Sequence, residues 1–135
     1  MKKSGILHAE LSRLVASMGH GDLLVIGDAG MPVPGGVPTI DLALRHGVPR
    51  FLDTLTTVLS ELHVEAGVVA DEMAAVSPEL SAAFAAAWPR DIPLRRVSHD
   101  QLKELTRTAR ALVRTGECTA YANVVLVSGV TFGGR

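Results

Sequence analysis

The run Leu23-Leu24-Val25-Ile26-Gly27-Asp28 is the stretch from which the expected fold follows. Its four apolar residues stand between turn signals, which is typical of a strand buried within a sheet. The Pro- and Gly-rich stretch 28–38 comes next and reads Asp-Ala-Gly-Met-Pro-Val-Pro-Gly-Gly-Val-Pro. Because it is too short and too apolar to separate two domains, we expect a shaped loop directly after this first strand.

The rest of the chain alternates between strand patterns and helix patterns. Apolar runs predict further strands over residues 39–44, 64–70, 94–97 and 123–127. Helical spacing of apolar residues predicts helices over residues 8–18, 49–62, 77–88 and 99–113. This order predicts a single α/β domain over residues 1–135 with three layers, in which a mostly parallel sheet carries helices on both faces.

Two serines are expected to mark the starts of helices. Ser77 precedes Pro78 and is expected to be an N-cap, with the proline at the first helical position. Ser98, followed three residues later by Gln101, matches a capping box. The apolar residues that the helix after Ser98 is expected to carry on one side are Leu102, Leu105, Ala109, Leu112 and Val113.

Composition and charge exclude several classes of partner. The chain has 13 Lys and Arg against 14 Asp and Glu, a formal net charge of −1, so neither nucleic acid nor an anionic membrane surface is expected. No apolar run reaches the roughly twenty residues of a membrane-spanning helix. The single cysteine, Cys118, and the lack of a long apolar stretch after Lys3 predict a cytoplasmic protein. A positive mean hydropathy predicts apolar surface that is covered in an oligomer.

Candidate ligand-binding residues follow from the topology, because open α/β sheets bind ligands outside the carboxyl ends of their strands. Asp28 stands at such an end, where its carboxylate either accepts hydrogen bonds from a ligand or closes an Asx-turn on its own backbone. His99 opens a predicted helix, where it either bonds a ligand or is incidental. Tyr121 and Asn123 adjoin the last strand, where core packing and a turn are the alternatives.

His20 lies between Gly19 and Gly21, just before the first strand. An imidazole titrates near neutral pH, which suits a general acid or base. From position alone, an exposed turn histidine without a chemical role is the favoured interpretation. The five histidines show no metal-binding helix spacing, and no dinucleotide fingerprint, P-loop or nucleophile elbow is present. Composition and spacing therefore indicate an α/β domain with a small-ligand site, in which a zinc site would have to assemble from distant residues.

Several strings of the sequence together resemble the ribose pyranase and fucose mutarotase family. They cover nearly the whole chain: Lys3-Ser4-Gly5-Ile6-Leu7, Gly19-His20-Gly21-Asp22, Val25 to Pro34, Ile40 to Ala43, Gly47-Val48-Pro49, Val58 to Glu65, Arg114-Thr115-Gly116-Glu117 and Tyr121-Ala122-Asn123. Two departures stand beside the matching residues. Gly21 replaces a common threonine and Ala120 a common proline, which puts the rigidity of both loops in doubt.

The resemblance implies an isomerase that opens and recloses a sugar ring by proton transfer, without metal or nucleotide. It makes His20 the proton donor, and this type of acid–base help contributes ~10²–10⁴-fold in rate. Glu117 is expected to shape the turn before Tyr121 rather than to touch sugar. The residues that carry over as sugar-binding are Asp28, His99, Tyr121, Ala122 (through its backbone) and Asn123.

Within the family, the ending Ser128-Gly129-Val130-Thr131-Phe132 and the helix start at His99 look like the ribose branch. This implies D-ribose as the partner and interconversion of its pyranose and furanose forms. The alternatives are the fucose branch, which exchanges anomers without changing ring size, and a non-catalytic sugar-binding accessory of a transporter. Family members are similar in forming decamers of two stacked pentameric rings, which fits the expected apolar surface.

Overall fold

The computed structural model describes residues 1–133. Its helices are α1 (Ala9–Ser17), α2 (Phe51–Leu59), α3 (Asp71–Val76), α4 (Pro78–Ala87) and α5 (His99–Thr106). Its strands are β1 (Leu23–Gly27), β2 (Thr39–Asp41), β3 (Val64–Ala70), β4 (Leu94–Val97), β5 (Ala111–Arg114) and β6 (Val124–Ser128). Among the helices of this described part, none is long and apolar enough to span a bilayer.

The six strands form one sheet in the order β2-β5-β1-β6-β3-β4. β6 is antiparallel to both of its neighbours, β1 and β3, and the other strand pairs are parallel. The predicted mostly parallel sheet is therefore confirmed. Because β6 runs against the rest, it begins at the edge where β1, β3 and β4 end. We call this the carboxyl edge, and the opposite edge, where β6 ends, the amino edge.

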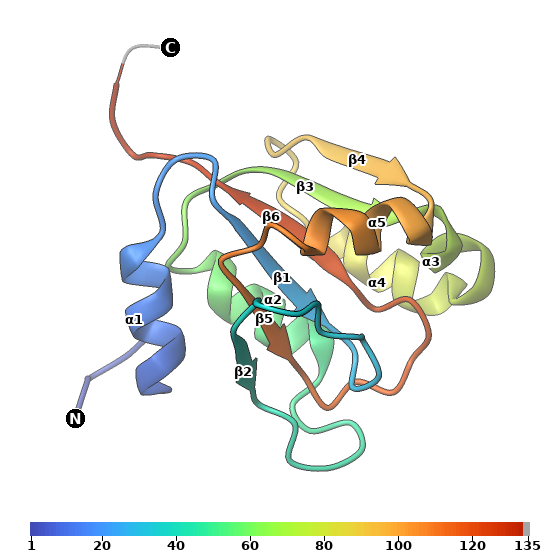
Figure 1. Cartoon of the computed structure of the whole chain (residues 1–135), viewed down its shortest axis with the longest axis horizontal. Helices are drawn as coiled ribbons and strands as arrows, with labels where there is room; N and C mark the ends of the chain where they lie inside the picture. The colour runs from blue at the N-terminus through green and yellow to red at the C-terminus, as the bar shows by residue number, and fades with distance from the viewer. Residues whose placement is uncertain (134–135) are drawn as a thin grey trace.

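Helices cover both faces of the sheet, which confirms the three predicted layers. Side chains alternate along β1, so that Leu24 and Ile26 pack with α1, α2 and α4, while Val25 faces the other side. There Val25 meets Leu102 of α5 and Val37 of the loop after β1. Figure 1 shows α5 in front of the sheet and α2 and α4 behind it. The larger of the two cores lies on the side of α2 and α4.

The prediction of a helix over 99–113 is wrong in its second half. α5 ends at Thr106, and Ala111–Arg114 is strand β5, which pairs with both β1 and β2. Leu112 is nevertheless in the same buried cluster as Leu102 and Ala109, so the spacing identified residues that pack together although they are not on one helix. A strand of four residues is too short to show the two-residue alternation of apolar and polar side chains. Its conformation is decided by pairing within the sheet.

The two serines behave differently. The Ser98 capping box is confirmed, since Ser98 Oγ accepts the Gln101 N–H at 3.2 Å and Gln101 Oε1 accepts the Ser98 N–H at 3.1 Å. Ser77 occupies the N-cap position of α4, but its hydroxyl makes no capping bond and donates instead to the Ala120 carbonyl at 2.7 Å. Helix α3, between β3 and Ser77, was not predicted.

Candidate functional site

Five of the six residues singled out in the sequence gather at the carboxyl edge. Asp28 directly follows β1, His99 opens α5 after β4, and Tyr121-Ala122-Asn123 lead into β6. Asn123 fastens the group, because its Oδ1 accepts the Asp28 N–H at 2.9 Å and its Nδ2 donates to Asp28 Oδ2 at 3.1 Å. We call Asp28, His99 and residues 121–123 the edge cluster.

Asp28 forms the Asx-turn that its position suggested, since the Gly30 N–H donates to Asp28 Oδ1 at 2.9 Å. This turn uses only part of the hydrogen-bonding capacity of the carboxylate, because both oxygens have further lone pairs. Burial raises the pKa of Asp28, against the smaller opposing effects of the Gly30 N–H, the Asn123 amide and the charge of His99. A carboxyl group that is partly desolvated in this way is suited to exchange a proton with a ligand hydroxyl.

His99 and Tyr121 form an aromatic corner beside Asp28. Their ring centroids are 4.9 Å apart and their planes meet at 80°, an edge-on contact. Glu72 of α3 holds the start of α5, because its Oε1 and Oε2 accept the His99 N–H at 3.0 and 3.2 Å. His99 Nδ1 is buried and has no hydrogen-bond partner within residues 1–133. A buried ring nitrogen without a partner is costly, and a ligand hydroxyl would satisfy it.

Tyr121 has a left-handed backbone, with φ of 63°. Such a conformation is strained for a residue other than glycine and persists only where its surroundings impose it. The Ser77 hydroxyl fixes the preceding carbonyl of Ala120, and the Asn123 N–H donates to the Tyr121 carbonyl at 2.9 Å. Sequence reasoning missed this role of Ser77, because its position before Pro78 indicated only a helix cap.

Glu117 is a buried acidic residue in the segment before Tyr121, and the expectation that it shapes that turn is confirmed. The residue is 4% exposed. Its Oε1 accepts the Phe51 N–H at the start of α2 at 3.1 Å, and its Oε2 accepts the Thr119 hydroxyl at 2.6 Å. Its backbone carbonyl accepts the Ala29 N–H at 2.8 Å. Glu117 thus ties the segment before Tyr121 to the loop after Asp28.

Two hollows lie near the cluster, and one of them is lined by a member of it, Asp28. One, of about 350 Å³, is lined by residues 28–30 and 117–120, and its size is within the roughly 300–1,000 Å³ of small-molecule sites. The other, of about 530 Å³, lies between residues 32–35 and the charged face of α5. Lys103, on that face, lines this hollow and is paired with Asp100 at 3.7 Å. No group of three or more potential metal ligands occurs within residues 1–133.

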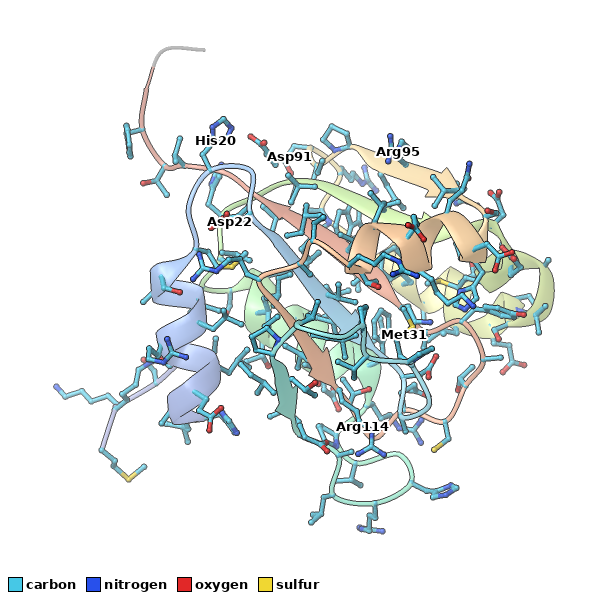
Figure 2. All side chains as sticks on the ribbon, in the orientation of Figure 1. His20, Asp22, Met31, Asp91, Arg95 and Arg114 are labelled. Atoms are coloured by element: carbon cyan, nitrogen blue, oxygen red, sulfur yellow. The ribbon has the colours of Figure 1, made fainter. Side chains whose placement is uncertain are left out.

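His20 does not lie with the others in the same chain. It precedes β1 and therefore belongs to the amino edge, which the five residues of β1 separate from the carboxyl edge by roughly 17 Å. Figure 2 shows His20 beyond one end of β1 and Met31, three residues after Asp28, beyond the other. The His20 side chain is 51% exposed, and its Nε2 lies 3.1 Å from Glu65 Oε2.

The fold and the edge cluster define a class, an α/β protein with a small polar-ligand site at the carboxyl edge of its sheet. Comparison with known sequences then identifies the chain as a member of the RbsD / FucU transport protein family, whose model matches residues 1–131. The resemblance seen in the sequence is therefore confirmed.

Individual relatives agree with this assignment. A D-ribose pyranase of Symbiobacterium thermophilum is 56% identical over 132 residues, covering 98% of this chain and all of the relative. A D-ribose pyranase of Pseudomonas fluorescens is 54% identical over 134 residues, again covering 98% of this chain and all of the relative.

Among solved structures, Bacillus subtilis RbsD complexed with D-ribose superposes with a TM-score of 0.93 at 42% identity, covering 98% of this chain and 100% of that one. The Streptococcus pneumoniae fucose mutarotase in complex with L-fucose superposes with a TM-score of 0.74 at 19% identity, covering 93% and 95% of the two chains. The second likeness shows a shared fold.

Proposed function

We propose that this protein is a D-ribose pyranase, an isomerase that interconverts β-D-ribopyranose and β-D-ribofuranose. The observation that carries the proposal is the edge cluster itself. It brings together at one edge of the sheet a partly desolvated carboxyl, an amide bonded to it and a buried imidazole nitrogen without a partner in residues 1–133. Relatives of similar length at 50–56% identity bear that name, and a structural neighbour is complexed with D-ribose.

The chemistry requires only proton transfers on a neutral sugar. The pyranose opens when the anomeric hydroxyl loses its proton and the bond between the anomeric carbon and the ring oxygen breaks, while that oxygen gains a proton. A different hydroxyl then attacks the aldehyde carbon to close the furanose. In the proposed mechanism, His20 gives the proton to the ring oxygen and Asp28 accepts the anomeric proton.

The remaining members of the cluster bind and orient the sugar. His99 Nδ1 accepts a hydrogen bond from a sugar hydroxyl. The Tyr121 ring packs against the sugar, and the backbone at Ala122 forms a hydrogen bond with it. Asn123 Nδ2 keeps one N–H free after its bond to Asp28, and that N–H donates to a sugar hydroxyl. When the open-chain sugar is held in this way, the hydroxyl that closes the furanose ring lies next to the aldehyde carbon. Holding the reacting groups close together increases the rate of ring closure.

Because His20 and the edge cluster occupy opposite edges of one sheet, we propose that the two halves of a site come from neighbouring copies. His20 of one copy then enters the edge cluster of the next. A head-to-tail contact of this kind generates a closed ring when the rotation between neighbouring copies closes. A decamer of two stacked pentameric rings is the assembly that we propose, and the cytoplasm is the compartment where we place it.

Exchange spectroscopy on purified protein tests the reaction. We expect pyranose–furanose exchange of ribose to be accelerated, and anomer exchange of L-fucose to be accelerated less. His20→Ala should lower the ribose rate by ~10²–10⁴-fold while ribose still binds. A preference for fucose would instead favour the mutarotase activity. Binding without any acceleration by the wild type would favour a transporter accessory.

A further inference from the structure

The single described partner of His20 in its own chain is a carboxylate on another strand. His20 Nε2 and Glu65 Oε2 are 3.1 Å apart, and the Glu65 side chain is 30% exposed. An ionised carboxylate only accepts hydrogen bonds, so the His20 Nε2 must be the donor. The contact therefore fixes where one proton of the imidazole is and leaves Nδ1 as the nitrogen that can exchange a proton.

The backbone at Glu65 is irregular in a way that serves this contact. In the pairing of β3 with β6, Val64 is opposite Ser128 and Ala66 is opposite Val127, so Glu65 is the extra residue of a β-bulge. Bulges redirect a side chain and occur frequently beside active sites. Without the extra residue, the side chain at this position would follow the regular alternation of β3.

The segments around the pair hold both partners in place. The Gly21 N–H donates to the Ser128 carbonyl at 2.8 Å, and the Ser128 N–H donates to the Asp22 carbonyl at 2.8 Å, so the turn that carries His20 is bound to the end of β6. Next along the chain, Gly129 leaves room for the bulge. A Cβ on Gly129 would stand 2.7 Å from His63 Cδ2 and 3.1 Å from Glu65 Cβ.

We propose that Glu65 is the positioning residue of His20. Resting on the proposed function, this assigns proton transfer to His20 Nδ1: as the sugar ring opens, the Nδ1–H bond breaks, the electron pair stays on Nδ1, and the proton forms the new O–H bond at the ring oxygen. The Nε2–H remains donated to Glu65, which orients the ring. Carboxylates orient metal-binding imidazoles in the same manner.

The test compares Glu65→Ala and Glu65→Gln with the wild type by two independent measurements. In Glu65→Ala we expect kcat for ribose exchange to fall about 10–100-fold, with KM changed by less than about twofold, because Glu65 is not part of the edge cluster. Glu65→Gln keeps an acceptor oxygen for Nε2–H and should recover part of the lost rate. Glu79→Ala, which removes an exposed carboxylate on α4, is the matched control and should leave kcat unchanged.

The second measurement is independent of sugar chemistry. The nitrogen-15 spectrum of protein with labelled histidine, with His20 assigned by comparison with His20→Ala, shows which ring nitrogen carries the proton. Above neutral pH, we expect the proton to be on Nε2 and hydrogen-bonded in the wild type, and the signal to become a mixture in Glu65→Ala. An unchanged ring spectrum, or an unchanged kcat in an active enzyme, would overturn the role of Glu65. A wild type without exchange activity but with this spectral change would overturn the proposed function and leave the pairing intact.

Discussion

At the scale of single residues, the candidate site depends on three groups whose conformation or surroundings are energetically unfavourable. Asp28 is partly removed from water, His99 has a buried nitrogen without a described partner, and Tyr121 adopts a left-handed backbone. Each of these features costs stability in the protein without ligand. Their concentration at one edge of the sheet is what distinguishes this region from the rest of the surface.

The pH dependence of stability tests the state of Asp28. Burial raises its pKa above the ordinary 3.8, so the folded protein holds this proton more tightly than the unfolded chain does. Between those two pKa values the folded state binds more protons, so stability falls as pH rises through that range and recovers as pH falls. We expect the wild type to gain stability relative to Asp28→Asn when the pH is lowered from neutral toward the ordinary pKa of 3.8.

Urea unfolding of both proteins at matched concentration measures this difference. Because Asp22, whose pKa is lowered mainly by the Gly19 N–H, titrates in both proteins, its contribution cancels in the comparison. A difference that stays constant across the pH range, or that grows in favour of Asp28→Asn on acidification, would show that Asp28 is not desolvated in the folded protein.

At the scale of elements, the carboxyl edge is assembled by contacts between loops. The Gly47 N–H donates to the Gly116 carbonyl, and the Gly116 N–H donates to the Pro49 carbonyl at 2.9 Å, so the loop before α2 is bound to the segment after β5. Glu117 then caps α2 through the Phe51 N–H. The edge cluster is thus supported by backbone contacts that a sequence pattern does not reveal.

Gly116→Ala tests this support. A Cβ at Gly116 would stand 2.3 Å from the Val48 carbonyl oxygen and 2.5 Å from that of Arg45, both of them backbone atoms. We expect a loss of about 1–3 kcal/mol in the free energy of unfolding, as for other overpacked sites, together with weaker ribose binding. The control is Gly35→Ala, where an added Cβ meets nothing within 4 Å. Equal stability of the two variants in urea titrations would contradict the close docking of these loops.

At the scale of the whole molecule, the separation of His20 from the edge cluster is the decisive feature. A single chain offers two half-sites on opposite edges of its sheet. In the proposed ring, each copy gives its His20 to one neighbour and receives an imidazole from the other. Oligomerisation would then be part of catalysis, since a dissociated chain would hold no complete site.

Mixed assemblies test this arrangement. His20→Ala and Asp28→Asn are each expected to be inactive alone. When they are refolded or coexpressed together in equal amounts, about a quarter of the head-to-tail contacts join an intact His20 to an intact Asp28, so about a quarter of wild-type activity should return. His20→Ala mixed with the double variant is the control and should recover nothing. Recovery no greater than in that control would place the whole site within one chain.

The sequence by itself determined most of the alternation of strands and helices, with helix α3 and strand β5 as exceptions, together with the first strand, its loop and the family. These depend on local signals, namely apolar runs, turn residues, the Ser98 capping box and short motifs. The tertiary structure alone decided that 111–114 is a strand, that Ser77 bonds Ala120 and that Glu65 is bulged toward His20. These features depend on which distant segments meet, because pairing and packing outweigh the weak local preferences of short stretches.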